Sequence, residues 1–301
     1  MTNPIDWNQL RAFLATAETG SLSAAARQLG LTQPTLGRQV SAIEERMGVT
    51  LFERGGKAIA LTPTGLDLLA HARAMGAAAQ ALCLQAAGRS QEVAGVVTVS
   101  ATDIVAVYLL APLVTQLREQ EPTIAIEVIS SDAMSDLLRR EADIAIRHVK
   151  PEQPDLIARL ICTATAGFYA SESYIKVHGH PRTAKDASHL PFVGADRSGE
   201  LLRYLQQHGL PIAEANFSCY ADSSMANWAL AQQGLGIGSM MQEIARSTPG
   251  IVRVLDDVPP IRFPVWLVTH RELRTSRRIQ LVFEALANGL AAAIKPSEEM
   301  A

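Results

Sequence analysis

The chain has 301 residues, of which 48% are hydrophobic and 19% are charged, and its formal net charge at pH 7 is -3. This composition is typical of a globular protein, and the sequence has no run of about 18 apolar residues, which argues against a membrane protein. A chain of this length suits two or more domains, since one domain usually takes roughly 100 to 200 residues.

The first residues of the chain and the spacing of its cysteines indicate the cellular compartment in which we expect the protein. Residues 1–6 contain no basic segment followed by an apolar stretch, so we expect no export and a cytoplasmic location. Cys83, Cys162 and Cys219 are far apart and odd in number, which argues against a disulfide framework or a zinc site. We expect them to be small, buried or half-buried side chains.

The first part of the chain holds three short helical patterns, each with a capping residue at its start. Asp6 precedes the first, Ser21 the second and Thr32 the third, and such side chains accept hydrogen bonds from the free N–H groups of a helix start. Apolar residues recur at three- and four-residue spacing in each pattern, and Gly30 ends the second. Two short helices joined by a tight turn predict a helix-turn-helix, whose second helix enters the major groove of DNA.

The outward side of the third helix carries residue types that read DNA. Gln and Arg side chains form paired hydrogen bonds with base edges, and Thr side chains reach phosphates or a thymine methyl group. Beyond it, Leu51-Phe52 predicts a buried anchor, and residues 53–61 predict a hairpin wing whose two basic residues contact the flanking DNA backbone. The predicted DNA contacts are Ser21, Thr32, Gln33, Thr35, Arg38, Arg54 and Lys57. Because basic and acidic residues over 1–61 differ in number by only one, a solvated face on a small helical bundle is the alternative.

Residues 62–88 predict one long helix, with Thr62 as its cap and Pro63 in its first turn, where the missing N–H costs nothing. About 26 residues of helix span roughly 40 Å. Apolar and small side chains, Leu66 and Leu82 among them, form a surface that suits pairing with a second copy of the chain, so we expect a dimer. The alternative is a helix that packs along its own domain.

Strand-like and helix-like runs alternate over the rest of the chain, before a final amphipathic helix at 275–294. The first three strand-like runs with helical stretches between them predict a parallel βαβαβ unit. The later runs indicate a second lobe, with a cleft between the two lobes. The strand-like runs are 96–99, 124–129, 144–146, 165–169, 192–193 and 216–220.

Polar residues stand where these strands end. In parallel sheets, ligands collect at the carboxyl ends of the strands, near helix N-termini. Hydroxyl and amide groups there bind carboxylates, and Arg147 supplies a positive charge, so we expect the ligand to be a small anion. The predicted ligand contacts are Ser100, Thr102, Ser131, Arg147, His148 and Asp222. The alternative is that these residues cap helices and brace turns.

The sequence offers no catalytic constellation, so we expect neither an enzyme nor a cofactor. His178, His180 and His189 have no Cys or carboxylate at ligand spacing, and we expect no metal site. The glycines of 234–238 lack the third spacing of a dinucleotide fingerprint and follow a helical pattern, not a strand. We expect these glycines to allow close packing or a tight turn.

Several motifs, spread over nearly the whole chain, occur together and in one order. They are Gly20-Ser21-Leu22, Ala24-Ala25-Ala26, Leu31-Thr32-Gln33-Pro34-Thr35-Leu36, Leu51-Phe52-Glu53-Arg54, Leu61-Thr62-Pro63-Thr64-Gly65, Asp143-Ile144-Ala145-Ile146-Arg147 and Gly234-Leu235-Gly236-Ile237-Gly238. This set closely resembles the LysR-type transcriptional regulators. Two departures stand out: Gly37 replaces a serine that is frequent in the recognition helix, and Met240-Met241-Gln242 lacks a proline usually found there.

The resemblance implies an α/β fold class with an N-terminal all-α winged helix-turn-helix at 1–61. It also implies a dimerising linker helix at 62–90 and a two-lobed effector domain at 91–301, similar to periplasmic binding proteins. Such regulators form a homodimer or homotetramer and bind double-stranded operator DNA, and a small-molecule effector alters how they bend DNA or contact RNA polymerase. The competing function is a cytoplasmic small-molecule-binding protein without a specific DNA target.

Overall fold

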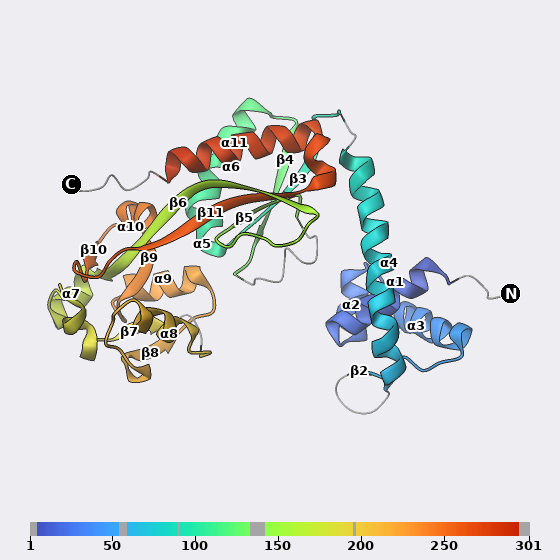
Figure 1. The fold of residues 1–301 in the computed structure, drawn as a ribbon, viewed down its shortest axis with the longest axis horizontal. Coiled ribbons are helices and arrows are strands. Elements are labelled where there is room, and N and C mark those ends of the chain that lie inside the picture. The colour runs from blue at the N-terminus through green and yellow to red at the C-terminus, as the bar shows by residue number, and fades with distance from the viewer. Residues whose placement is uncertain (1–4, 54–58, 89–90, 133–141, 195–196, 295–301) are drawn as a thin grey trace. The chain divides into compact units, whose positions relative to one another are not determined.

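The computed structural model describes residues 5–53, 59–88, 91–132, 142–194 and 197–294. The chain divides into two compact units, Met1–Ala86 and Ala87–Ala301 (Figure 1). Each unit has its own hydrophobic core. In these described ranges, no helix is both long and apolar enough to cross a membrane.

The first unit begins with the three expected helices. The predicted caps are confirmed: Asp6 Oδ1 accepts from the backbone N–H of Asn8 at 2.8 Å, and the side chains of Ser21 and Thr32 each accept from a backbone N–H in the first turn of their helix at 3.4 Å. The helices are α1 (Trp7–Thr19), α2 (Leu22–Gln28) and α3 (Gln33–Met47).

Buried apolar side chains from all three helices form the core of this unit. Phe13, Leu36 and Ile43 are almost completely buried, as are Leu51 and Phe52, which confirms the predicted anchor. The expected hairpin is an antiparallel pair of short strands, β1 (Phe52–Glu53) and β2 (Ala60–Leu61). Its entry is held by Glu44, whose Oε1 accepts from the N–H groups of Leu51 at 2.8 Å and Phe52 at 3.2 Å.

The long helix α4 (Pro63–Gly88) has 26 residues, as predicted. The Thr62 hydroxyl caps its start by accepting from the backbone N–H of Gly65 at 3.0 Å. Leu69 is buried in the core of the first unit, whereas Leu66 and Leu82 are 59% and 70% exposed. One side of the helix therefore packs along its own domain near the helix start, and apolar side chains are exposed both there and farther on.

The second unit contains the predicted parallel strands. In register, Val99 of one strand lies beside Val128 and Ile144 of its two neighbours. These strands are β3 (Gly95–Ala101), β4 (Ile124–Ser130) and β5 (Ile144–Arg147). The first crossover is a continuous helical run, α5 (Asp103–Val105), the π-helical η1 (Ala106–Leu110) and α6 (Ala111–Gln120). The second predicted crossover helix, at 134–138, lies outside the described residues.

Two long antiparallel strands join the two lobes of this unit, β6 (Leu156–Ser171) and β11 (Ile261–His270). Strand order in the sheet is β10-β6-β11-β5-β3-β4, with β9 paired to β6, where β9 is Gly238–Met241 and β10 is Ile251–Val254. The strand predicted at 165–169 is thus too short. The second half of β6 is buried on both faces and the first half is partly exposed, so neither half shows the two-residue alternation that marks a strand in a sequence.

The second lobe packs small strands and helices around its own core. Tyr174, Phe192, Leu210 and Ile237 are among its most deeply buried side chains. Its strands are β7 (Phe192–Gly194), β8 (Phe217–Tyr220), β9 (Gly238–Met241) and β10 (Ile251–Val254). Its helices are α7 (Glu172–His178), η3 (Ala184–His189), α8 (Glu200–Gln207), η4 (Glu214–Asn216), α9 (Ser224–Gln232) and α10 (Gln242–Ser247).

The glycines of 234–238 lie where this lobe is tightly packed. A Cβ on Gly236 would lie 2.7 Å from the carbonyl carbon of Phe192, and one on Gly238 would lie 2.9 Å from the Cβ of Ala231. The prediction of close packing is therefore confirmed.

The chain ends in the expected amphipathic helix, α11 (Arg277–Ala293), which follows the short turn η5 (Arg271–Thr275). Ile279, Val282, Leu286 and Leu290 are buried, and the helix contacts α6 as well as the sheet (Figure 1). The first lobe comprises β3 to β5, their crossover, α11 and the adjoining ends of β6 and β11.

Candidate nucleic-acid interface and ligand site

The turn between α2 and α3 fixes the third helix against the second. Gly30 has φ +64°, a conformation that favours glycine, and the N–H of Leu31 donates to the carbonyl of Ala26 at 2.8 Å. Across the turn, the Ser23 hydroxyl donates to Oε1 of Gln33 at 3.2 Å. These contacts hold the start of α3 in one orientation on a packed helix pair.

The structure places most of the predicted DNA contacts together on the N-terminal half of α3. Thr32, Gln33 and Arg38 are exposed, and Thr35 is half-buried. The hydroxyls of Thr32 and Thr35 lie 2.9 Å apart, and Nε of Arg38 donates to the carbonyl of Pro34 at 3.4 Å. The face thus offers hydroxyl, amide and guanidinium groups within two turns of one helix.

The structure does not place the other three predicted DNA contacts on this face of α3. Ser21 is half-buried and caps α2, so its hydroxyl already has a structural role. Arg54 and Lys57 lie outside the described residues. Ser23, exposed and paired with Gln33, belongs to the same face but was not predicted, because only the folded turn brings α2 beside that glutamine.

Ser100, Thr102, Ser131 and Arg147 come together because β3, β4 and β5 are parallel neighbours. Arg147 Nη2 donates to Oγ of Ser100 at 2.8 Å, and its Nη1 donates to the carbonyls of Ser100 at 3.2 Å and Ile146 at 2.9 Å. The N–H of Ser131 donates to the carbonyl of Ala101 at 3.0 Å. The Arg147 guanidinium therefore braces the end of β3.

Thr102 occupies the cap position of α5 without a capping hydrogen bond from its side chain. Its Oγ1 is buried and has no partner within the described ranges. A buried hydroxyl without a partner costs free energy, so this group is suited to a ligand or an ordered water.

The last two predicted ligand contacts have other surroundings. His148 packs against β11, with its ring perpendicular to that of Phe263 at a centroid distance of 4.9 Å. Burial lowers the pKa of His148 below its ordinary value of 6.5, the charge of Arg147 acts in the same direction, and a hydrogen bond with the backbone of Pro264 opposes both. Asp222 is exposed just before α9.

A second set of polar residues, not predicted as ligand contacts, joins the strand ends to the second lobe. The Asp132 carboxylate accepts from the N–H of Asp103 at 3.1 Å, and from the N–H and hydroxyl of Ser224 at 2.5 and 3.1 Å. The Asp103 carboxylate accepts from the hydroxyls of Ser130 at 2.5 Å and Ser223 at 2.8 Å. We call these five residues the interlobe cluster. Two polar runs that contain four of these residues, 130–132 and 222–224, are recognisable in the sequence. The hydrogen bonds between the cluster residues are not.

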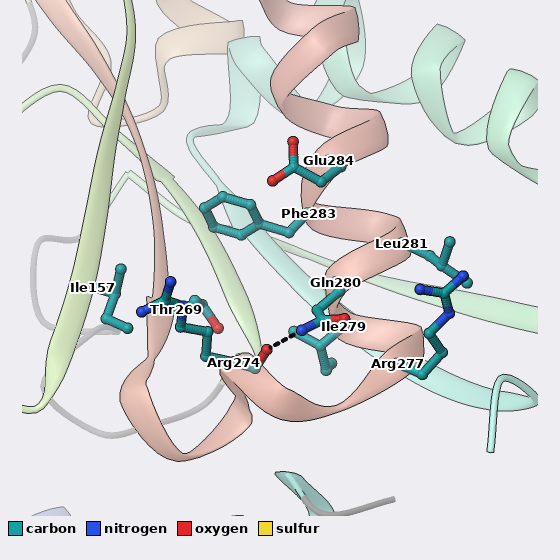
Figure 2. A pocket seen from close by; sticks show the side chains of 9 residues that line it. All are labelled: Ile157, Thr269, Arg274, Arg277, Ile279, Gln280, Leu281, Phe283 and Glu284. Carbon is teal, nitrogen blue, oxygen red and sulfur yellow. Dashed lines mark hydrogen bonds between the residues drawn. The ribbon is translucent and has the colours of Figure 1, made fainter. Parts of the chain in front are cut away.

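A groove of about 410 Å³ lies elsewhere, beside the start of β6 and along α11. Figure 2 shows Arg274 and Phe283 on one side of α11, and Arg277 and Leu281 on the other. The amide of Gln280 donates to the carbonyl of Arg274 at 2.7 Å. Since its lining includes none of the predicted ligand contacts, the groove does not coincide with the candidate ligand site.

The remaining candidate groups have ordinary structural surroundings. Within the described ranges, no group of three or more His, Cys, Asp or Glu residues is placed to hold a metal ion. The ring of His178 lies 4.5 Å from that of Tyr174. The cysteines are free; Cys162 and Cys219 are half-buried as expected, but Cys83 on α4 is exposed, so the expectation was wrong for that residue.

Two family models match the chain. Residues 7–66 match the model described as a bacterial regulatory helix-turn-helix protein of the lysR family, and residues 90–291 match the LysR substrate binding domain. A competing function without a DNA target is not favoured, because the first model covers the helix-turn-helix.

Similar proteins include a curated relative and solved structures. The chain is 30% identical over 199 residues to the HTH-type transcriptional regulator CrgA of Neisseria meningitidis, an alignment that spans 64% of each chain. The fold of the chain is similar to that of the full-length virulence activator AphB of Vibrio cholerae, with a TM-score of 0.64 and 19% identity. The match covers 94% of the chain and 99% of AphB. The chain is also similar to full-length CbnR in complex with its target DNA, with a TM-score of 0.58, 20% identity and coverage of 94% and 99%.

Proposed function

This chain belongs to the LysR-type transcriptional regulators, and we propose that it recognises a specific operator in double-stranded DNA through α3 and responds to a small molecule bound at the strand ends of its second unit. The alignment with CrgA spans 64% of that protein, which is less than two thirds of its length.

One observation carries the DNA-binding proposal. The N-terminal half of α3 presents Thr32, Gln33 and Arg38 to solvent. The turn between α2 and α3 and the buried side chains of Leu36 and Val40 hold this helix in place. Amide and guanidinium groups in such a position form paired hydrogen bonds with base edges in the major groove. CbnR, which shares this fold, was solved with its target DNA.

A mobility-shift experiment tests this proposal. The purified full-length chain is titrated onto the DNA that flanks its own gene, with unlabelled competitor DNA and a salt series. We expect a competitor-resistant band whose affinity falls steeply with salt, because binding releases counterions from neutralised phosphates. If correctly folded protein gives no specific band at low salt, the proposal is wrong, and a small-molecule-binding role without a DNA target takes its place.

The proposed effector is a small anion. The candidates for its contacts are those predicted from the sequence: Ser100, Thr102, Ser131, Arg147, His148 and Asp222. The juxtaposition of Ser100 and Arg147 and the unpartnered hydroxyl of Thr102 support the first lobe as the place of binding. A thermal-shift screen of anionic, neutral and cationic metabolites checks this; binding of only neutral or cationic compounds, unaffected by Arg147→Ala, would contradict it.

The proposed function includes a domain organisation and an oligomeric state. We place the DNA-binding domain at 1–61, the dimerising helix at 62–90 and the effector domain at 91–301, in a homodimer or homotetramer that acts in the cytoplasm. A contact with RNA polymerase follows if the regulator activates transcription. No reaction, metal or cofactor is assigned to the chain.

A further inference from the structure

The interlobe cluster places a carboxylate of the first lobe on the start of a helix of the second. Asp132 follows β4, and its carboxylate oxygens accept from the backbone N–H and the hydroxyl of Ser224, the first residue of α9. The same carboxylate accepts from the N–H of Asp103 at the start of α5. One side chain therefore satisfies donors from both lobes.

The position that Asp132 occupies is one that favours any small anion. The first N–H groups of a helix have no partner within the helix, and the aligned peptide dipoles attract negative charge there. The helix α9 has nine residues, and the observed occupant of its start is a carboxylate of the same chain.

The contacts around Asp103 reinforce this arrangement. Ser223 caps α9 by accepting from the N–H of Ala226 at 3.4 Å, and its hydroxyl donates to the Asp103 carboxylate at 2.8 Å. The N–H of Ile104 donates to Oγ of Ser224 at 3.1 Å. The lobes are thus joined in both directions, by carboxylates of the first lobe with donors of the second and by an N–H of the first with a hydroxyl of the second.

We propose that Asp132 is an internal ligand whose carboxylate holds the two lobes together at the start of α9 until a carboxylate of the effector displaces it. This inference rests on the proposed effector-binding function and names its regulation: the effector competes with a group of the protein for the same donors. The buried Thr102 hydroxyl, directly before Asp103 in the chain and unpartnered within the described ranges, is available to the incoming anion.

Competition has a measurable consequence. An external carboxylate binds only the fraction of molecules in which Asp132 has left its donors, so its apparent affinity is reduced by that fraction. Removing the side chain abolishes the competition. The N–H groups of Asp103 and Ser224 then lose their acceptor and exchange with solvent faster until an added anion replaces it.

The experiment uses the full-length chain with Asp132→Ala, the more conservative Asp132→Asn, and Glu119→Ala as a control that removes an exposed carboxylate from α6. Hydrogen exchange is followed in peptides that cover residues 102–106 and 222–228, while sodium acetate replaces sodium chloride at constant ionic strength. In Asp132→Ala we expect exchange at least about tenfold faster than in the original protein, restored in part by acetate. Acetate should act at concentrations at least about tenfold lower in this variant than in the original protein.

Asp132→Asn keeps a hydrogen-bond acceptor but not the charge, so its exchange rates should lie between those of Asp132→Ala and the original protein. The exchange rates of Glu119→Ala should match those of the original protein. Equal responses to acetate in Asp132→Ala and the original protein would overturn the proposal, as would unchanged exchange in both Asp132 variants. Because no DNA is present, a failed mobility shift would leave these results standing, and a failed acetate response would leave operator binding standing.

Discussion

At the residue scale, Arg38 provides the sharpest test of base recognition. It is exposed on α3, one turn from Pro34, among the residues proposed to face the major groove. If its guanidinium reads a base, Arg38→Ala should cost roughly 1 to 3 kcal/mol in discrimination between operator and nonspecific DNA. If it contacts phosphate, the variant should weaken binding to all DNA about equally and flatten the salt dependence.

Fluorescence anisotropy with operator and scrambled duplexes over a salt series separates these outcomes. The control is Arg11→Ala, which removes the same charge from the exposed side of α1. Binding by Arg38→Ala that matches this control for both duplexes would remove Arg38 from the interface.

His148 is the residue whose ionisation should link stability to pH. Burial, the main cause, lowers its pKa in the folded protein below the ordinary 6.5. Between the two pKa values the unfolded chain binds more protons, so stability falls as pH decreases below about 6.5 and levels off below the folded pKa. His148→Gln cannot take up the proton and should reduce this dependence.

Urea denaturation of the effector-domain transition at about pH 7.5 and 5.5 measures the effect. His189→Gln, which removes an exposed histidine from the second lobe of the same unit, serves as the control. The same loss of stability in His148→Gln and the original protein would show that other groups cause it.

At the element scale, the helices were more predictable than the strands. Caps such as Asp6 and Thr32 and the regular apolar spacing defined the first helices, because local hydrogen bonds and one buried face determine them. The extent of β6 was not predictable, since its pairing with β11, β9 and β10 depends on residues far along the chain. The candidate site divides in the same way: Ser100 and Arg147 follow from parallel strand order, whereas the pairing of Asp132 with Ser224 exists only in the folded molecule.

The helix α3 carries a glycine that the packing does not require. A Cβ added to Gly37 would meet no atom within 4 Å. Gly37→Ala should therefore raise the free energy of unfolding by about 0.5 to 1 kcal/mol, through the higher helix propensity of alanine. Gly65→Ala should do the opposite, because its Cβ would collide with the carbonyl oxygen of Leu51.

Chemical denaturation followed by circular dichroism measures both variants, with the transition of the first unit analysed separately. A destabilised Gly37→Ala would mean that the helix surface around this residue is not open. A Gly65→Ala as stable as the original would contradict the close contact between α4 and the chain at Leu51.

At the scale of the whole molecule, the exposed apolar side chains of α4 bear on assembly. Leu66 and Leu82 are 59% and 70% exposed, and apolar side chains exposed along one helix are expected where a second copy covers them. A 26-residue helix offers enough length for paired contacts between two copies.

Leu82→Glu should therefore convert the assembly to smaller species, because a dimer with parallel or antiparallel α4 helices would bury a carboxylate at an apolar contact without a partner. Sedimentation velocity gives the distribution of species across a concentration series. The matched control is Val177→Glu, which places the same charge on α7 at a residue 77% exposed in the second unit. If Leu82→Glu sediments like the control, Leu82 does not lie in the contact between copies.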